Sequence, residues 1–127
     1  MKSTMSIGHE KLDVYQLAIT YVAWVVKVSS KLKGDNRNAK DQWLRASQSI
    51  PLNIAEGNGK TTSADRRRFF EIARGSALEC AAIQDVIEVL GILEADENRQ
   101  HKQELDRIAA MLSRLGGRGY PGHTGPG

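Results

Sequence analysis

The sequence has a single cysteine, no long apolar run and almost no strand pattern. Because Cys80 is the only thiol among 127 residues, no disulfide can form within the chain, which excludes a small secreted disulfide-stapled protein. The longest stretch without a charge, residues 14–26, has 13 residues, whereas a membrane-spanning helix needs about 20. Residues 1–11 contain no apolar stretch of the signal-peptide type. These absences predict a soluble cytoplasmic protein that does not enter a membrane.

Patterns for catalysis and metal binding are also scarce. The three histidines, His9, His101 and His123, lie in different segments, and no Glu-x-x-His motif is present. Cys80 falls on an apolar helix face, where a packing role is expected. The loop at residues 57–62 resembles the end of a phosphate-binding loop, but it lacks the first glycine and follows no strand. We therefore expect no enzyme, no metal and no cofactor.

What the sequence does contain is helical periodicity. Apolar residues recur at helical spacing over residues 10–32, 39–57, 63–93 and 96–115, with short turn-type clusters between them. This pattern predicts an all-α fold, an antiparallel up-and-down four-helix bundle in one domain at residues 10–115. Residues 1–9 are expected to be a flexible N-terminus. Residues 116–127, which hold six of the twelve glycines, are expected to be a disordered Gly/Pro-rich tail.

Three local signals refine the predicted helices. Pro51 lies inside the second helix, and because it removes a backbone hydrogen bond it predicts a kink there. Thr62 and Asp65 have the spacing of a capping box at the start of the third helix. Gly75 and Gly91 are candidate kink positions within that helix.

The first predicted helix is apolar on most of its circumference. Leu12, Tyr15, Ile19, Val22 and Val26 form one seam at about 100° per residue, and a second seam lies on nearly the opposite side. A small bundle buries only one face of a surface helix, so the other face needs a neighbour. We therefore expect a homo-oligomer with this helix in the interface. The candidate interface residues are Val14, Ala18, Tyr21, Trp24, Val25 and Val28.

Basic residues concentrate in the N-terminal part of the chain. Residues 1–75 hold 13 basic and 7 acidic side chains, and residues 76–127 hold 5 and 8. Such a surface can contact phosphates without reading sequence, although a solvated helix face would look the same. The candidate nucleic-acid-binding residues are Lys31, Lys33, Arg37 and Lys40 around the first turn, with Lys60, Arg66, Arg67 and Arg74 around the second.

Three segments give the chain a family resemblance. They are residues 12–18 (LDVYQLA), 45–57 (RASQSIPLNIAEG) and 68–79 (RFFEIARGSALE). With these motifs the chain resembles the 23S ribosomal RNA intervening-sequence proteins, and the likeness extends to about residue 115. The resemblance implies an antiparallel bundle that assembles into a ring-like homopentamer. It also implies similarity to the accessory protein of diversity-generating retroelements, a basic pentamer that partners a reverse transcriptase and nucleic acid.

Polar residues within these motifs predict a structural network. Arg68 and Glu79 fall on the predicted core stripe of the third helix, where charges must be paired. We expect a buried network across the second and third helices, made by Arg45, Ser49, Asn53, Glu56, Arg68 and Glu79.

Two functions remain open from the sequence. The first is a non-catalytic oligomer whose basic surface binds RNA, DNA or a DNA/RNA hybrid. The second is a protein-interaction scaffold, for example an accessory subunit of a reverse transcriptase. An exposed apolar patch that oligomerisation does not cover would favour the second function.

Overall fold

A computed structural model of the chain describes residues 12–116, and within them it contains four α-helices and no strand. The helices are α1 (Asp13–Ser29), α2 (Arg37–Asn58), α3 (Ser63–Val89) and α4 (Ala95–Leu115), with a short 3-10 helix, η2 (Gly34–Asn36), before α2. These bounds confirm the four predicted helical segments to within a few residues. The predicted flexible N-terminus at 1–9 and nearly all of the predicted tail lie outside the described residues.

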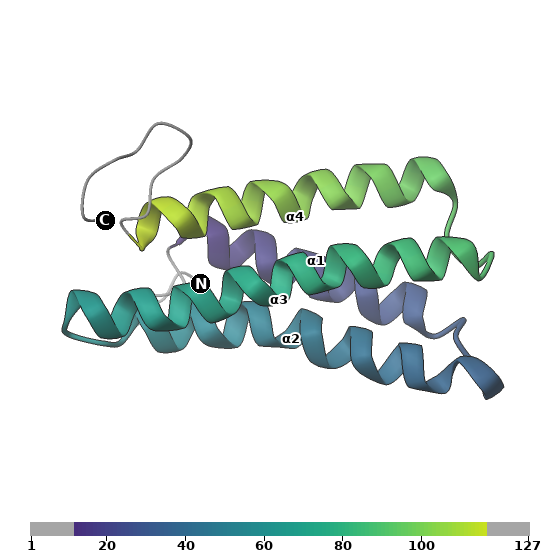
Figure 1. Cartoon of the computed structure of the whole chain (residues 1–127), viewed down its shortest axis with the longest axis horizontal. Helices are drawn as coiled ribbons and strands as arrows, with labels where there is room; N and C mark the ends of the chain where they lie inside the picture. Colours follow the sequence, from purple (N-terminus) through teal and green to yellow (C-terminus); the bar gives the residue numbers. More distant parts are fainter. Residues whose placement is uncertain (1–11, 117–127) are drawn as a thin grey trace, which may run out of the picture.

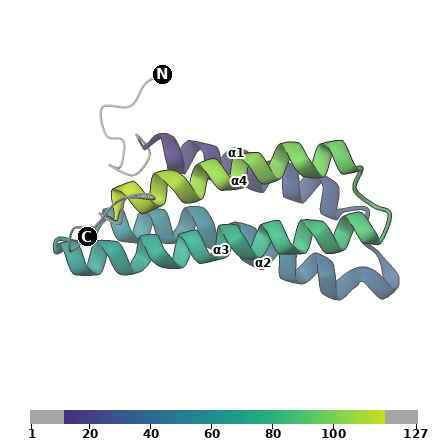
Figure 2. The same cartoon turned by 45° about the horizontal axis from the view of Figure 1, so that its top comes forward.

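The four helices pack as a bundle in which each helix contacts two neighbours. α1 and α3 each pack against α2 and α4, and the backbones of α1 and α3 do not approach each other within residues 12–116. Figures 1 and 2 show that the α1–α2 and α3–α4 turns lie at one end of the bundle. The α2–α3 turn lies at the other end, together with the start of α1 and the end of α4.

The local signals have mixed outcomes. Thr62 Oγ1 accepts a hydrogen bond from the Asp65 amide at 3.1 Å, which is the forward half of the predicted capping box. α2 runs unbroken through Pro51, and α3 runs unbroken through Gly75. Gly91 lies beyond the end of α3 with φ +81°, where the Ile92 amide bonds back to the Ile87 carbonyl. Gly91 therefore ends this helix rather than kinking it, because glycine adopts the left-handed conformation at low cost.

A continuous apolar core fills the bundle along its length. Burying each large apolar side chain contributes about 1.5–3 kcal/mol. Its largest fully buried apolar and aromatic members are Tyr21, Leu32, Trp43, Ile50, Ile54, Phe70, Ile87, Leu105, Ile108 and Leu112. Within residues 12–116 no helix is both long and apolar enough to cross a membrane.

Candidate nucleic-acid interface

The two predicted basic clusters lie at opposite ends of the bundle. Lys31, Lys33 and Arg37 flank the α1–α2 turn, whereas Lys60 and Arg66 flank the α2–α3 turn. α2 joins these turns, and its 22 residues extend about 33 Å at 1.5 Å per residue. The eight candidate residues therefore do not form one surface within a single chain.

At the α2–α3 end, the basic side chains are engaged by the protein itself. The Arg66 guanidinium donates to the Asn58 carbonyl at 3.0 Å, near the C-terminal end of α2. Arg67 Nε donates to the Gly116 carbonyl at 3.0 Å, just beyond α4. Lys60 Nζ lies 3.1 Å from a Glu56 carboxylate oxygen. Asn58 is the last residue of α2 and Gly116 is the first residue after α4, so the two arginines satisfy carbonyls that a helix end leaves open.

Arg74 belongs to neither end. Its half-buried side chain lines a shallow depression between α3 and α4 with Asp106 and Ser113, and its Nε is buried without a hydrogen-bond partner among the described residues. The depression also contains apolar Leu78. A single arginine beside a carboxylate does not build a phosphate-binding surface.

At the α1–α2 end, the basic side chains are available to solvent. Lys31, Lys33 and Arg37 are exposed and Lys40 is half-buried, and none of the four has an ion pair within residues 12–116. α2 begins here without a side-chain cap from Asn36, so its positive helix end faces the same region. We call Lys31, Lys33, Arg37 and Lys40 the turn cluster.

The predicted buried charge network is wrong. Arg45, Glu56, Arg68 and Glu79 are exposed. The polar contact that joins α2 to α3 is smaller: Ser76 Oγ donates to Ser49 Oγ at 2.8 Å, and the Asn53 amide donates to the same oxygen at 3.0 Å. α3 is rotated relative to the prediction, so Phe70, Ala77 and Gln84 face the core while Ile72, Val86 and Leu90 are exposed. This rotation carries Arg68 and Glu79 to the outside.

The predicted interface residues of α1 point the other way. Val14, Ala18, Tyr21, Val25 and Val28 are at most 4% exposed in the single chain, so they belong to its core and cannot contact a second copy. Trp24 is half-buried and committed to α4: its Nε1 donates to Glu97 at 3.0 Å, and its ring stacks on His101. The seam left outside is the first of the two predicted seams, with Ile19 and Val26 exposed.

One polar chain in the core was missed by sequence reasoning. Trp43 Nε1 donates to the Tyr21 hydroxyl at 3.1 Å, that hydroxyl donates to Gln84 Oε1, and Gln84 Nε2 donates to Asn98 Oδ1 at 2.9 Å. All four residues are buried, and each helix supplies one of them: Tyr21 from α1, Trp43 from α2, Gln84 from α3 and Asn98 from α4. Gln84 was the available signal, because an amide at a core position needs partners. Burial raises the pKa of the Tyr21 hydroxyl well above its ordinary value and the pKa of the Cys80 thiol to about 12, so both stay protonated.

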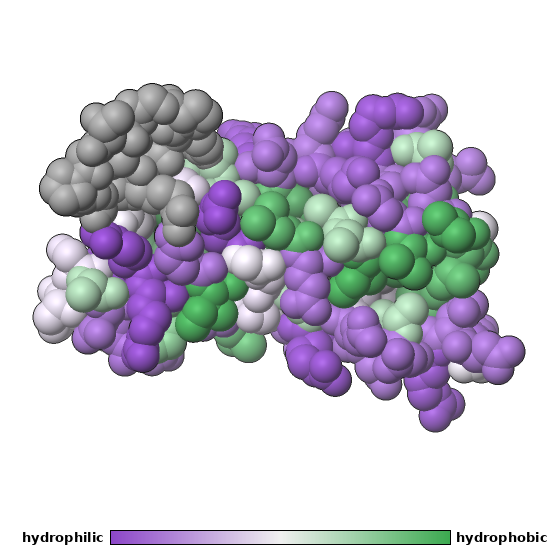
Figure 3. Space-filling view, viewed as in Figure 1, coloured by the Kyte–Doolittle hydropathy of each residue, from purple (hydrophilic) through white to green (hydrophobic). Residues whose placement is uncertain are grey.

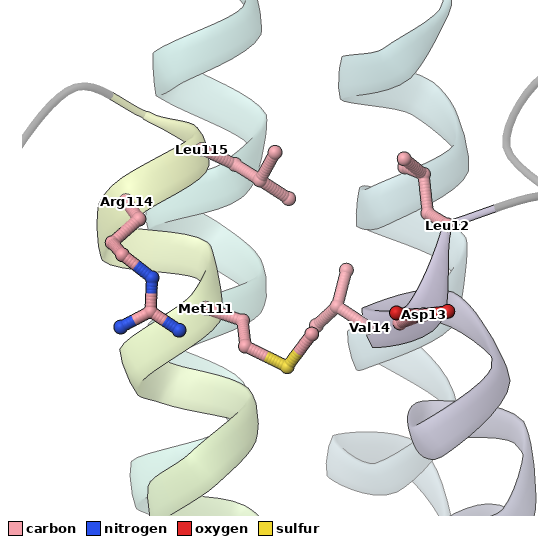
Figure 4. Close-up of a pocket in the computed structure, with 6 residues that line it drawn as sticks. All are labelled: Leu12, Asp13, Val14, Met111, Arg114 and Leu115. Carbon is pink, nitrogen blue, oxygen red and sulfur yellow. The ribbon is translucent and has the colours of Figure 1, made fainter.

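A shallow apolar groove opens between the start of α1 and the end of α4. Figure 4 shows Leu12, Val14, Met111 and Leu115 lining it, with Asp13 and Arg114 at its edges. Its lining is mainly aliphatic and contains no serine, cysteine or histidine. Within residues 12–116 no group of three metal-ligating side chains occurs.

The fold and these surfaces define an all-α four-helix protein with charged helix turns. The model of the 23S rRNA-intervening sequence protein family matches residues 10–114. The chain therefore belongs to this family.

A solved structure shows the same fold. It is a protein with unknown function from the S23 ribosomal protein family of Bacteroides thetaiotaomicron VPI-5482. The two chains are 18% identical, with a TM-score of 0.72 over 80% of this chain and 96% of that chain. No curated protein matches the chain.

Proposed function

We propose that this chain is a non-catalytic homo-oligomer that binds nucleic acid, RNA or a DNA/RNA hybrid, through the turn cluster of an antiparallel up-and-down bundle. The observation that carries the proposal is that Lys31, Lys33 and Arg37 are exposed and have no ion pair within residues 12–116. Unpaired lysines and arginines beside a helix N-terminus attract phosphate oxygens. Contacts of this kind bind the nucleic-acid backbone and carry no sequence information.

Oligomerisation strengthens the proposal because one chain offers few phosphate contacts. Residues 27–41 hold five basic and two acidic side chains. A ring-like homopentamer, which the family resemblance implies, would repeat this cluster once per copy. Repeated weak sites on one assembly raise the overall affinity through effective concentration.

A salt series tests the binding. The purified full-length protein is titrated into a structured RNA, an RNA/DNA hybrid and duplex DNA at salt concentrations from 50 to 200 mM. If six or more phosphates are contacted, the affinity falls about 10³-fold or more over this range, because bound counterions are released. No binding at 50 mM salt to any of the three would overturn the proposal.

A matched pair of variants locates the surface. Lys31→Ala/Lys33→Ala removes two cations from the turn cluster, and Arg45→Ala/Arg107→Ala removes two exposed cations from α2 and α4. The first variant is expected to lower the slope of log affinity against log salt by about 0.7–0.9 for each phosphate that the protein no longer neutralises. The second variant has the same net charge and is expected to keep the parent slope. Equal losses in the two variants would mean that binding depends on overall charge and not on the turn cluster.

A specific observation favours a second function. The groove between the start of α1 and the end of α4 is lined by Leu12, Val14, Met111 and Leu115, and Leu115 is 41% exposed. An apolar groove of this kind suits a protein partner, so a scaffold or an accessory subunit, for example of a reverse transcriptase, is the alternative. If the full-length protein forms the oligomer but binds none of the three nucleic acids, this alternative is supported.

A further inference from the structure

Two apolar stripes lie outside the core on helices whose backbones do not touch. Figure 3 shows apolar surface along the α3 face of the bundle, between charged side chains. The α1 stripe has exposed and half-buried members: Tyr15, Ile19, Val22 and Val26. The α3 stripe is exposed throughout: Ile72, Gly75, Glu79, Ala82, Val86 and Val89.

Both stripes follow the spacing of helices that pack along their length. The α1 positions 15, 19, 22 and 26 are separated by four, three and four residues, and the α3 positions 72, 75, 79, 82, 86 and 89 by alternating three and four. This alternation is the seam pattern of coiled coils, in which one helix faces another over several turns. Among residues 12–116 the α3 positions and Ile19 and Val26 of α1 are exposed, whereas Tyr15 also packs against the edge of the core.

Gly75 gives an independent indication of a missing neighbour. It lies in the middle of the 27-residue helix α3, and a Cβ added there would meet nothing within 4 Å. Glycine is among the least favourable residues inside a helix, and no packing within the described residues requires it here. A helix from outside that approaches α3 closely would require it.

We propose that the α1 stripe of one copy packs against the α3 stripe of a second copy. The inference rests on the homo-oligomer of the proposed function and adds which two surfaces meet. Side-chain size supports the pairing: the α1 stripe is bulky at every position, whereas the α3 stripe is small at Gly75 and Ala82, so knobs on one meet spaces on the other. A stripe paired with its own copy would place bulky residues against bulky ones in α1.

Charge supports the same pairing. The Glu79 carboxylate lies near the middle of the α3 stripe and has no ion pair within residues 12–116. Lys27 is exposed beside Val26 and is also without an ion pair among these residues, so α1 of a second copy can supply the missing cation. Two α3 stripes packed in opposite directions would instead bring two Glu79 carboxylates together, which is unfavourable.

The pairing also determines the type of assembly. A two-fold dimer through one stripe would leave the other stripe exposed in both copies. The α1–α3 contact covers both stripes with one repeated interface, which is a head-to-tail arrangement. Such an arrangement closes into a ring when the rotation between neighbours divides a full turn.

Site-specific cross-linking tests the pairing. Three samples are prepared: the Val22→Cys variant alone, the Ala82→Cys variant alone, and the two variants co-expressed. Each sample is treated with a short bis-maleimide, and the native Cys80 is buried and does not compete. A cross-linked dimer is expected in the co-expressed sample and not in either variant alone. Co-expression of Val22→Cys with Gln48→Cys, on the exposed face of α2, is the control and is expected to give none. A cross-link in Ala82→Cys alone would overturn the proposal in favour of a two-fold contact.

A second variant separates this inference from the proposed function. Ala82→Arg, at an exposed position, is expected to reduce the mass measured by light scattering to that of one chain while the circular dichroism keeps its helical signal. Gln48→Arg is the control and keeps the parent mass. An oligomeric Ala82→Arg protein would overturn the stripe pairing and leave the homo-oligomer standing. A monomeric parent protein would overturn both.

Discussion

The two ends of the bundle carry similar numbers of basic residues and use them differently. At the α2–α3 end, Arg66 and Arg67 donate to backbone carbonyls and Lys60 pairs with Glu56. At the α1–α2 end, Lys31 and Lys33 extend into solvent with no ion pair among the described residues. Two helices finish at each end, and the difference is that within residues 12–116 only at the α2–α3 end do arginines donate to the open carbonyls, those of Asn58 and Gly116. A cluster of cations in a sequence is therefore a binding surface only where its side chains are not already bonded to the protein itself.

The largest expected effect comes from Arg66→Ala, which removes a side-chain hydrogen bond at the α2–α3 end. The variant removes a charged donor from the Asn58 carbonyl, and hydrogen bonds to charged groups contribute about 1.5–3 kcal/mol. We expect the free energy of unfolding, measured by urea denaturation, to fall by about that amount. Lys33→Ala at the α1–α2 end is the control, and its free energy of unfolding should stay within about 0.5 kcal/mol of the parent value. Equal stability of the two variants would erase the distinction between the ends.

Gly57→Ala tests how tightly the same end is packed. A Cβ at Gly57 would lie 2.8 Å from the Phe70 ring, closer than carbon atoms pack, so α2 and α3 would have to separate. Such overpacking costs about 1–3 kcal/mol. Gly59→Ala, two residues away, is the control, because its Cβ would lie no closer than 3.6 Å to its neighbours. If both variants melt at the same temperature, the close contact at Gly57 does not determine stability.

The smallest expected effect concerns an exposed charge pair between α3 and α4. Lys102 Nζ lies 2.7 Å from Asp85 Oδ1, and the hydrogen bonds from Lys102 and Asn98 lower the pKa of Asp85 below its ordinary value of 3.8. A lowered pKa in the folded state means that the pair stabilises the protein above that ordinary value and ceases to do so as the pH falls through the folded pKa. Because the pair is exposed, the effect is small.

Asp85→Asn should therefore remove a small part of the acid sensitivity. We expect the parent to lose slightly more stability than the variant when thermal melts at pH 6 and pH 2.5 are compared. Asp106→Asn, at an exposed carboxylate with no ion pair among the described residues, is the control. A larger pH dependence in Asp85→Asn than in the parent would contradict the sign of the pKa shift.

The sequence predicts the helices well and their rotations poorly. Turn residues such as Gly34 and Gly91 mark the helix ends, because local conformation decides them. Rotation is decided by contacts between helices: α1 has two seams of similar hydrophobicity, and Tyr21 is selected for the core because Trp43 and Gln84 can bond its hydroxyl. The same limit applies to the candidate nucleic-acid-binding residues. Whether the Arg66 guanidinium can bind a phosphate depends on the Asn58 carbonyl, which the fold places beside it.

The polar chain through the core has a consequence for the outside of the molecule. This polar chain contains one residue from each helix: Tyr21, Trp43, Gln84 and Asn98. Sliding any helix by one turn, about 5.4 Å, would leave a polar group stranded in apolar surroundings. These four hydrogen-bonded residues therefore fix the positions of the helices along the bundle axis. Contacts inside a single chain therefore determine the positions of the α1 and α3 stripes relative to each other.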